Sequence, residues 1–235
     1  MFSRRYIHFF YLGILLFVFC YGLSAQVSKS FNIDSILNQH VTKNDPYNGV
    51  ILIAEKGKSI FQQAYGYRDI ETGVKLKVDD VFELASVSKQ FTAMIVMMLQ
   101  QEGKLNYDDP IAKYLYIPYK GITIRNLLNH TSGLPDYQEI MDKHWDKSKA
   151  AGNNDILEYL NKYAPPVLFL PGAKYEYSNT GYVLLASIAE KASGEDFSMM
   201  LRKRIFFQVK HDAYRHSYGF RKKEIVKSCL WSHVG

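Results

Sequence analysis

The first arrangement in this sequence that could do chemistry is a serine placed one helical turn before a lysine. These residues are Ser86 and Lys89, and apolar side chains follow them at helical spacing as far as Leu99. Residues three apart on a helix lie on one face, so we expect the Ser86 hydroxyl and the Lys89 amine to share a pocket. A serine becomes a good nucleophile when a neighbouring base takes its proton, and a desolvated lysine can be that base. Taken alone the pair is a weak signal, and a surface serine and lysine at a helix start remain an alternative.

A second arrangement is the run Tyr177-Ser178-Asn179, which follows the turn predicted at Pro171-Gly172. A phenol beside a lysine ammonium loses its proton more easily and can serve as a general base or acid. If the loop is extended, Asn179 points to the same side as Tyr177, where its amide could hold a substrate carbonyl and the lysine. A second Tyr-x-Asn, Tyr159-Leu160-Asn161, lies within a predicted helix, where packing is the better interpretation.

Helices dominate the elements that must position these residues. Helical patterns cover residues 31–41, 111–115, 154–163, 182–192 and 197–207, and Thr123 is expected to cap a further helix. One β-hairpin is predicted, from an apolar strand at residues 50–54 to a second strand at residues 59–67. The continuous apolar run suggests that the first strand is buried on both faces. A two-stranded hairpin is marginal by itself, so either it adds to a sheet elsewhere or this chain stops before the rest of its sheet.

Taken together, the motifs closely resemble the serine β-lactamase and penicillin-binding-protein superfamily. They are, in order, Ser86-Val87-Ser88-Lys89, the segment from Thr123 to Pro135 that contains His130-Thr131-Ser132-Gly133, and Tyr177-Ser178-Asn179 after Pro171-Gly172. A Tyr-Ser-Asn second element, in place of Ser-Asp-Asn, is most similar to the branch of class C β-lactamases, D-alanyl-D-alanine peptidases and related esterases. The resemblance runs from about residue 48 to 205. It implies an α+β, β-lactamase/transpeptidase-like fold, with a helical region and an antiparallel sheet of which only the N-terminal hairpin is encoded here.

The resemblance also implies roles for individual residues. Ser86 would attack a carbonyl, Lys89 and Tyr177 would manage its proton, and Asn179 would orient the substrate and the lysine. The Ser86 backbone N–H, at a helix start, would give one oxyanion donor. His130 lies in a stretch that is scaffold in this family, so we expect a structural hydrogen bond from it, although His130 and Ser132 could also suggest a Ser-His pair. No metal or other cofactor is predicted, because the histidines show no ligand spacing.

The resemblance breaks near the C-terminus, where the family's third motif, Lys/His-Thr/Ser-Gly on a strand, is expected. Only Ser232-His233-Val234-Gly235 offers a similar pattern, too early and without strand neighbours, and we interpret it as coincidence. We therefore expect a C-terminally truncated domain at residues 26–207, followed by an atypical tail at 208–235. A frameshift is one explanation of that tail.

The N-terminus predicts export. Arg4 and Arg5 precede an apolar run, and Leu23-Ser24-Ala25 follows it with small residues, which is typical of a signal peptide at residues 1–25 cleaved after Ala25. The expected location is periplasmic or secreted. An uncleaved N-terminal anchor is the alternative, and the signal segment is then the chain's only expected contact with the membrane.

Charge and cysteine content narrow the partners. The formal net charge is +6, but residues 202–235 hold nine Lys or Arg against two Asp or Glu, so the basic character belongs to the tail. An exported chain rarely meets nucleic acid, and no nucleic-acid partner is expected. Cleavage would leave Cys229 as the only cysteine, which excludes an internal disulfide.

The sequence thus predicts an exported serine hydrolase that forms an acyl-enzyme on Ser86. Its substrate would be a small molecule or peptide with an amide or ester bond: a β-lactam, a D-Ala-type peptide such as a peptidoglycan fragment, or an ester. Two alternatives stay open. The chain could be a catalytically deficient, truncated fragment, or a non-enzymatic cell-envelope binding module of the same fold.

Overall fold

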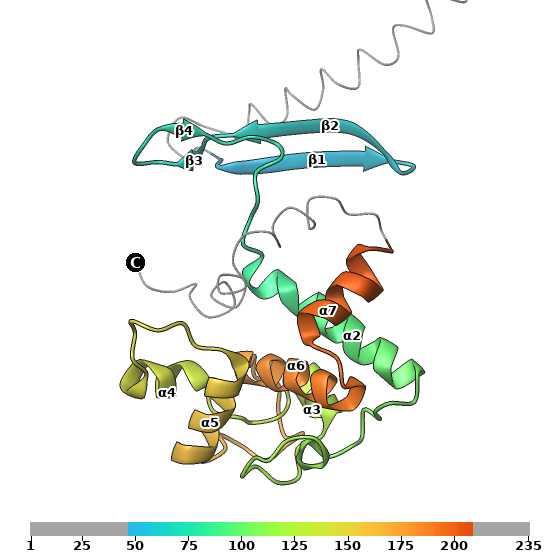
Figure 1. Cartoon of the computed structure of the whole chain (residues 1–235), viewed down its shortest axis with the longest axis vertical. Coiled ribbons are helices and arrows are strands. Elements are labelled where there is room, and N and C mark those ends of the chain that lie inside the picture. Colours follow the sequence, from blue (N-terminus) through green and yellow to red (C-terminus); the bar gives the residue numbers. More distant parts are fainter. Residues whose placement is uncertain (1–46, 209–235) are drawn as a thin grey trace, which may run out of the picture. The chain divides into compact units, whose positions relative to one another are not determined.

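The computed structural model describes residues 47–208, which form two compact units divided between residues 80 and 81 (Figure 1). In the first unit, β1 (Gly49–Glu55) pairs antiparallel with β2 (Lys58–Tyr65), and β3 (Tyr67–Asp69) pairs with β4 (Val74–Lys75). The first pair is the predicted hairpin, whereas the short second pair is additional. The turn Lys56-Gly57 has positive φ at both residues, the geometry that joins two tightly paired strands.

Strand β1 differs from the prediction in its burial. It was expected to be covered on both faces, but Leu52 is 58% exposed, and within residues 47–208 the strand pairs only with β2. Both faces of a strand are buried only where other elements pack on both sides of its sheet, and the exposure of Leu52 shows that its face is open here.

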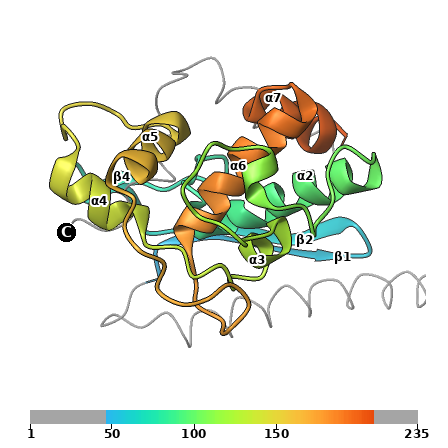
Figure 2. The ribbon, with the colours of Figure 1, turned by 90° about the horizontal axis from the view of Figure 1, so that it is seen from below.

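The second unit consists of helices packed around α6 (Asn179–Ser193). This helix contacts α2 (Lys89–Gln101), α3 (Ile124–Leu128), α5 (Asn153–Tyr163) and α7 (Phe197–Leu201), and Figure 2 shows it in the middle of the group. Its central position explains its composition, because a helix surrounded by others is apolar on most of its surface. The buried residues of α6 are Thr180, Gly181, Leu184, Leu185, Ala186, Ser187, Ile188 and Ala189.

The predicted helix boundaries hold with local differences. Thr123 caps α3 as predicted, with its hydroxyl accepting from the Asn126 N–H, while residues 111–113 form only a 3₁₀ turn. Helix α7 is followed by a π-helical turn at Arg202–Phe206. Helix α4 (Tyr137–His144) was not predicted, although Asp136 caps it through the Gln138 N–H. The helix predicted at residues 31–41 lies outside the described residues.

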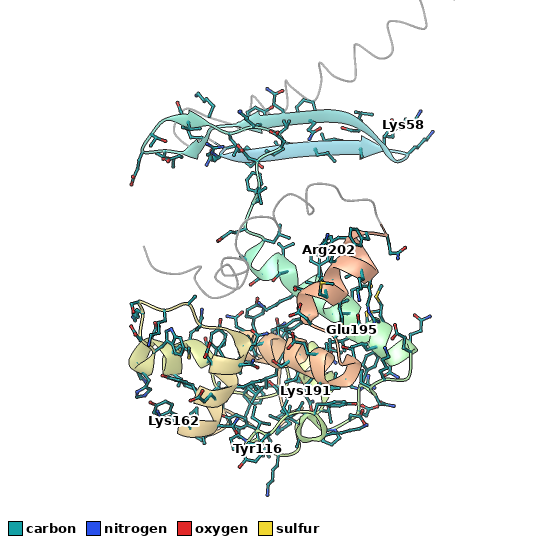
Figure 3. All side chains as sticks on the ribbon, in the orientation of Figure 1. Lys58, Tyr116, Lys162, Lys191, Glu195 and Arg202 are labelled. Atoms are coloured by element: carbon teal, nitrogen blue, oxygen red, sulfur yellow. The ribbon has the colours of Figure 1, made fainter. Side chains whose placement is uncertain are left out.

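Ion pairs join the end of α6 to its neighbours. Glu195, labelled in Figure 3, lies between α6 and α7 and binds Arg204, which also binds Glu102 at the end of α2. This bridge ties the C-terminal ends of α2 and α6, whose other ends carry the candidate site. No helix within residues 47–208 is long and apolar enough to cross a membrane.

Candidate active site

Ser86 lies in a 3₁₀ turn (Ala85–Ser88) that leads directly into α2. The residue before it, Ala85, has φ +43°, a left-handed conformation that costs a non-glycine residue roughly 1–3 kcal/mol. Such strain is common beside reactive groups, because it fixes a side chain in one direction. Lys89 is the first residue of α2, and its Nζ lies 3.1 Å from Ser86 Oγ. The expected Ser–Lys contact is therefore present, across a junction of two helix types.

Tyr177 and Asn179 reach the same two residues from a different part of the chain. The Tyr177 hydroxyl donates to Ser86 Oγ at 2.7 Å, and Lys89 Nζ donates to Asn179 Oδ1 at 2.8 Å. Ser86 thus contacts a phenol and an amine at once, and the amine is held by an amide. The four predicted side chains form one connected hydrogen-bonded group.

Asn179 is positioned differently from the expectation. It was placed in an extended loop, but it is the first residue of α6, and Ser178 is the N-cap, with its hydroxyl accepting from the Gly181 N–H at 3.1 Å. Thr180 is fully buried, donates to the Pro135 carbonyl and accepts from the Tyr137 N–H. A helix cap on one side and a buried anchor on the other hold Asn179 in place.

His130 contacts this group through Tyr177 and Ser178. Its Nδ1 accepts from the Ser178 N–H at 3.0 Å, and its ring stacks on Tyr177 and Tyr182 with centroids 4.7 and 5.0 Å away. The predicted structural hydrogen bond is therefore present. The Ser-His alternative has no support in this geometry, because buried Ser132 accepts from the Leu134 N–H and no hydrogen bond among the described residues joins it to His130.

Electrostatics differ between the two rings that stack here. Burial raises the pKa of the Tyr177 phenol, but hydrogen bonds with Lys89 and Ser86 and the charge of Lys89 outweigh it, so its pKa lies below the ordinary value of 10. Burial, helped by the charge of Lys89, lowers the pKa of His130. A lower phenol pKa increases the fraction of phenolate that is available to accept a proton from Ser86, while His130 is favoured in its neutral form.

Tyr182 is the site residue that sequence reasoning missed. Its ring stacks on His130 and lies 5.8 Å from Lys89 Nζ, and its hydroxyl donates to the Leu128 carbonyl. A signal was available, because Tyr182 follows Asn179 by three residues and so shares its helix face. The rings of Tyr177, His130 and Tyr182 form one continuous stack beside Lys89, and Tyr177 remains 49% exposed.

Comparisons with known proteins identify the family of this chain. The family model described as Beta-lactamase matches residues 33–215, which is most of the chain. The chain belongs to the β-lactamase family. Penicillin-binding protein 4* of Bacillus subtilis is 44% identical over 161 residues, covering 68% of this chain and 36% of that protein. Protein flp of Staphylococcus aureus is 29% identical over 203 residues, covering 83% of this chain and 40% of that protein.

Solved structures place the fold in the same family. A penicillin-binding protein from Bacillus halodurans has a TM-score of 0.63 and 29% identity, covering 71% of this chain and 51% of that one. D-amino acid amidase from Ochrobactrum anthropi has a TM-score of 0.56 and 31% identity, covering 68% and 44%. The fold is the predicted α+β, β-lactamase/transpeptidase-like one. The chain spans about two fifths of the length of the curated relatives it matches.

Proposed function

We propose that this chain is an exported serine hydrolase that forms an acyl-enzyme on Ser86 with an amide or ester substrate. The observation that carries the proposal is the position of Ser86 Oγ, which lies 3.1 Å from Lys89 Nζ and 2.7 Å from the Tyr177 hydroxyl. These distances are within the reach of direct proton transfer. A family in which serine hydrolases are general supports the same reaction class.

Acylation would begin with attack of Ser86 Oγ on the substrate carbonyl carbon. The serine proton passes to Tyr177 or Lys89, whichever is unprotonated, and then to the amine or alcohol that leaves when the carbonyl–heteroatom bond breaks. The lowered pKa of Tyr177 supports its part in this relay. A water molecule then attacks the ester formed on Ser86, the same groups accept its proton, and Ser86 is regenerated with the acid as product.

Asn179 would orient the substrate and hold the Lys89 amine in position next to Ser86. Its Oδ1 accepts from Lys89, which leaves the amide N–H groups available to donate to an acyl carbonyl. The Ser86 backbone N–H, at the start of the helical segment, would supply one oxyanion donor. This division of roles follows from the donor and acceptor inventory of the group.

The substrate class rests on similarity. One structural neighbour is described as a D-amino acid amidase, another as a penicillin-binding protein, and the curated relative as penicillin-binding protein 4*. These names favour small molecules or peptides, with peptidoglycan-derived D-amino acid compounds as the first group to test and β-lactams and simple esters beside them.

Export rests on the signal-like residues 1–25. If a signal peptidase cleaves after Ala25, N-terminal sequencing of protein from the periplasm or medium begins at Gln26. Recovery of Met1 in that material would favour the uncleaved anchor.

Hydrolysis of a substrate panel tests the proposed activity. The panel pairs a D-amino acid amide, a p-nitrophenyl ester and a chromogenic cephalosporin, each measured with wild-type protein, Ser86→Ala and Ser88→Ala. Ser88 is the matched control, because it lies in the same turn and its hydroxyl donates to the Ala85 carbonyl. Turnover that Ser86→Ala abolishes and Ser88→Ala retains supports the proposal. Absence of turnover from folded wild-type protein with every substrate contradicts it and favours the deficient fragment or the binding module.

A further inference from the structure

His130 holds the segment that carries two members of the site from two directions. Its carbonyl accepts from the Glu176 N–H at 2.8 Å, and its ring Nδ1 accepts from the Ser178 N–H at 3.0 Å. Residue 177 lies between these two anchors and residue 179 follows the second. One histidine therefore fixes the backbone on both sides of Tyr177.

The backbone of His130 explains how one residue can make both contacts. Its φ is +56°, a left-handed conformation that is uncommon outside glycine and in which asparagine, aspartate and histidine are enriched. A histidine pays a conformational cost there, and the neighbouring hydrogen bonds from His130 N to Leu127 O and from Thr131 N to Asn126 O hold the turn.

The imidazole ring completes the support by stacking. It lies against Tyr177 at 4.7 Å and 28° and against Tyr182 at 5.0 Å and 28°, while Tyr175 meets it edge-on at 5.9 Å. The same ring therefore sets the plane of the phenol that contacts Ser86. A change in its position or charge would reach Tyr177 through the stack and Asn179 through Ser178.

We propose that neutral His130 is a positioning residue for Tyr177 and Asn179, and that its protonation releases both from Ser86 and Lys89. This inference rests on the proposed function for its kinetic consequence. A neutral ring whose Nδ1 accepts from Ser178 carries its proton on Nε2, so the next proton must bind at Nδ1. That proton would turn the Ser178 contact into one between two donors, and the bond would be lost.

Burial and the charge of Lys89 oppose protonation of the ring and lower the pKa of His130, because both disfavour the charged imidazolium. Lys89 on α2 contributes a positive charge, Tyr175 and Tyr177 face the ring from the preceding loop, and Tyr182 faces it from α6. No carboxylate among the described residues acts on the ring as a charge partner. The ordinary pKa of histidine is 6.5, and the pKa of His130 is lowered from it, so we expect the protonated form to appear only at lower pH than for an ordinary histidine.

A test that needs no turnover follows the ring by NMR. In wild-type protein, the His130 Cε1–H signal and the Ser178 amide signal should shift with the same midpoint below pH 6.5, and His130→Asn should abolish the Ser178 step. His144→Asn is the matched control, because His144 also stacks on a tyrosine, Tyr163, at 3.9 Å. If the Ser178 amide signal does not shift over the pH range in which the His130 signal titrates, the inference is wrong.

A kinetic test uses the rate of adduct formation on Ser86 with a fluorophosphonate probe, measured by mass spectrometry from pH 4.5 to 9. The wild-type rate should fall more steeply with decreasing pH once His130 is protonated, and His130→Asn should lack this extra step, because Asn tolerates positive φ and keeps an acceptor but does not titrate. His130→Ala should slow saturated acylation by about 100-fold with little change in the half-saturating concentration, which is the size expected when a reacting group is displaced by about 1 Å.

The outcomes separate this inference from the proposed function. If folded wild-type protein forms no adduct, the proposed function fails, and the NMR titration still decides whether His130 controls Ser178. If the adduct forms and His130→Asn keeps the wild-type pH profile, the positioning role is wrong. Thermal melting of each variant distinguishes a lost fold from a displaced Tyr177.

Discussion

The chain contains the triplet Tyr-x-Asn twice, and the two copies differ in every contact that matters for chemistry. Tyr177 and Asn179 reach Ser86 and Lys89. In contrast, Asn161 donates to the Leu157 carbonyl, one turn back on its own helix, and to the Tyr116 carbonyl. The residue between Tyr159 and Asn161, Leu160, is fully buried in the core. The same residue types thus form part of a candidate site in one region and pack a helix in the other.

Backbone geometry explains the difference. Residues two apart within a helix do not face each other, so the Tyr159 and Asn161 side chains diverge on α5. The other copy straddles a helix start, where Ser178 has extended φ and ψ of −133° and 118° and Asn179 begins α6. One extended residue before a helix brings the two side chains to the same side. The function of a Tyr-x-Asn triplet therefore depends on whether it spans a helix start or lies within a helix, as well as on its residue types.

Removal of the two phenols should give the largest contrast. Tyr177→Phe should slow acylation of Ser86 by about 10²–10⁴-fold, the range typical of a lost general acid–base group. Tyr159→Phe should leave the rate unchanged and alter the free energy of unfolding by less than about 0.5 kcal/mol, because its hydrogen bond to the His144 carbonyl is long, at 3.4 Å. Equal rates for the two variants would remove the distinction between the copies.

The pH dependence of acylation should depend on Tyr177 and not on Tyr159. The pKa of Tyr177 is lowered from 10, so the unprotonated phenol that accepts the serine proton becomes populated at lower pH than for an ordinary tyrosine. Acylation should rise with pH and level off below pH 10, and Tyr177→Phe should lose that rise. Absorbance at 295 nm should show an early step that Tyr177→Phe reduces and to which Tyr67, whose pKa Lys75 lowers, also contributes, whereas burial raises the pKa of Tyr119 to about 12. A wild-type profile that Tyr177→Phe does not change would contradict a role for this phenol.

A smaller effect is expected from the cap that forms the junction. Ser178→Ala removes the hydroxyl that accepts from the Gly181 N–H and should cost about 1 kcal/mol of unfolding free energy. Because the cap also places Asn179, the acylation rate should fall too. The matched change on the other helix is Gly152→Ala, since Gly152 is the N-cap of α5 and makes no side-chain cap. That variant should not affect acylation, and denaturant melts with rate measurements compare the two.

The smallest effect should come from the second asparagine. Asn161→Ala removes two hydrogen bonds to carbonyls and should cost about 1 kcal/mol in unfolding free energy without slowing acylation. Asn179→Ala, by comparison, should slow acylation with a smaller effect on stability, because its bond to Lys89 lies on the partly exposed side of the fold. A slow Asn161→Ala enzyme with native stability would show that the α5 copy has a chemical role.

The sequence predicted the residues of this group better than their setting. Ser86 and Lys89 follow from helical spacing, and their contact in the structure depends only on local geometry. Asn179 was expected in an extended loop, but it begins a helix that Ser178 caps. The local sequence is compatible with both conformations, and the contact of buried Thr180 with the Pro135 carbonyl, which fixes the helix start, is tertiary. His130 and Tyr182 approach Tyr177 through tertiary packing, so spacing alone could not place them. Leu52 shows the reverse limit: an apolar run predicts a strand, but burial depends on which other elements cover it.

The most direct test of the account is the site of covalent modification. After reaction with a fluorescent penicillin or a fluorophosphonate, digestion and tandem mass spectrometry should locate the adduct on Ser86, in wild-type, Ser88→Ala and Tyr159→Phe proteins alike. Ser86→Ala should carry no adduct. A folded wild-type protein with no adduct, or with an adduct on another residue that persists in Ser86→Ala, would contradict the central claim that Ser86 is the nucleophile.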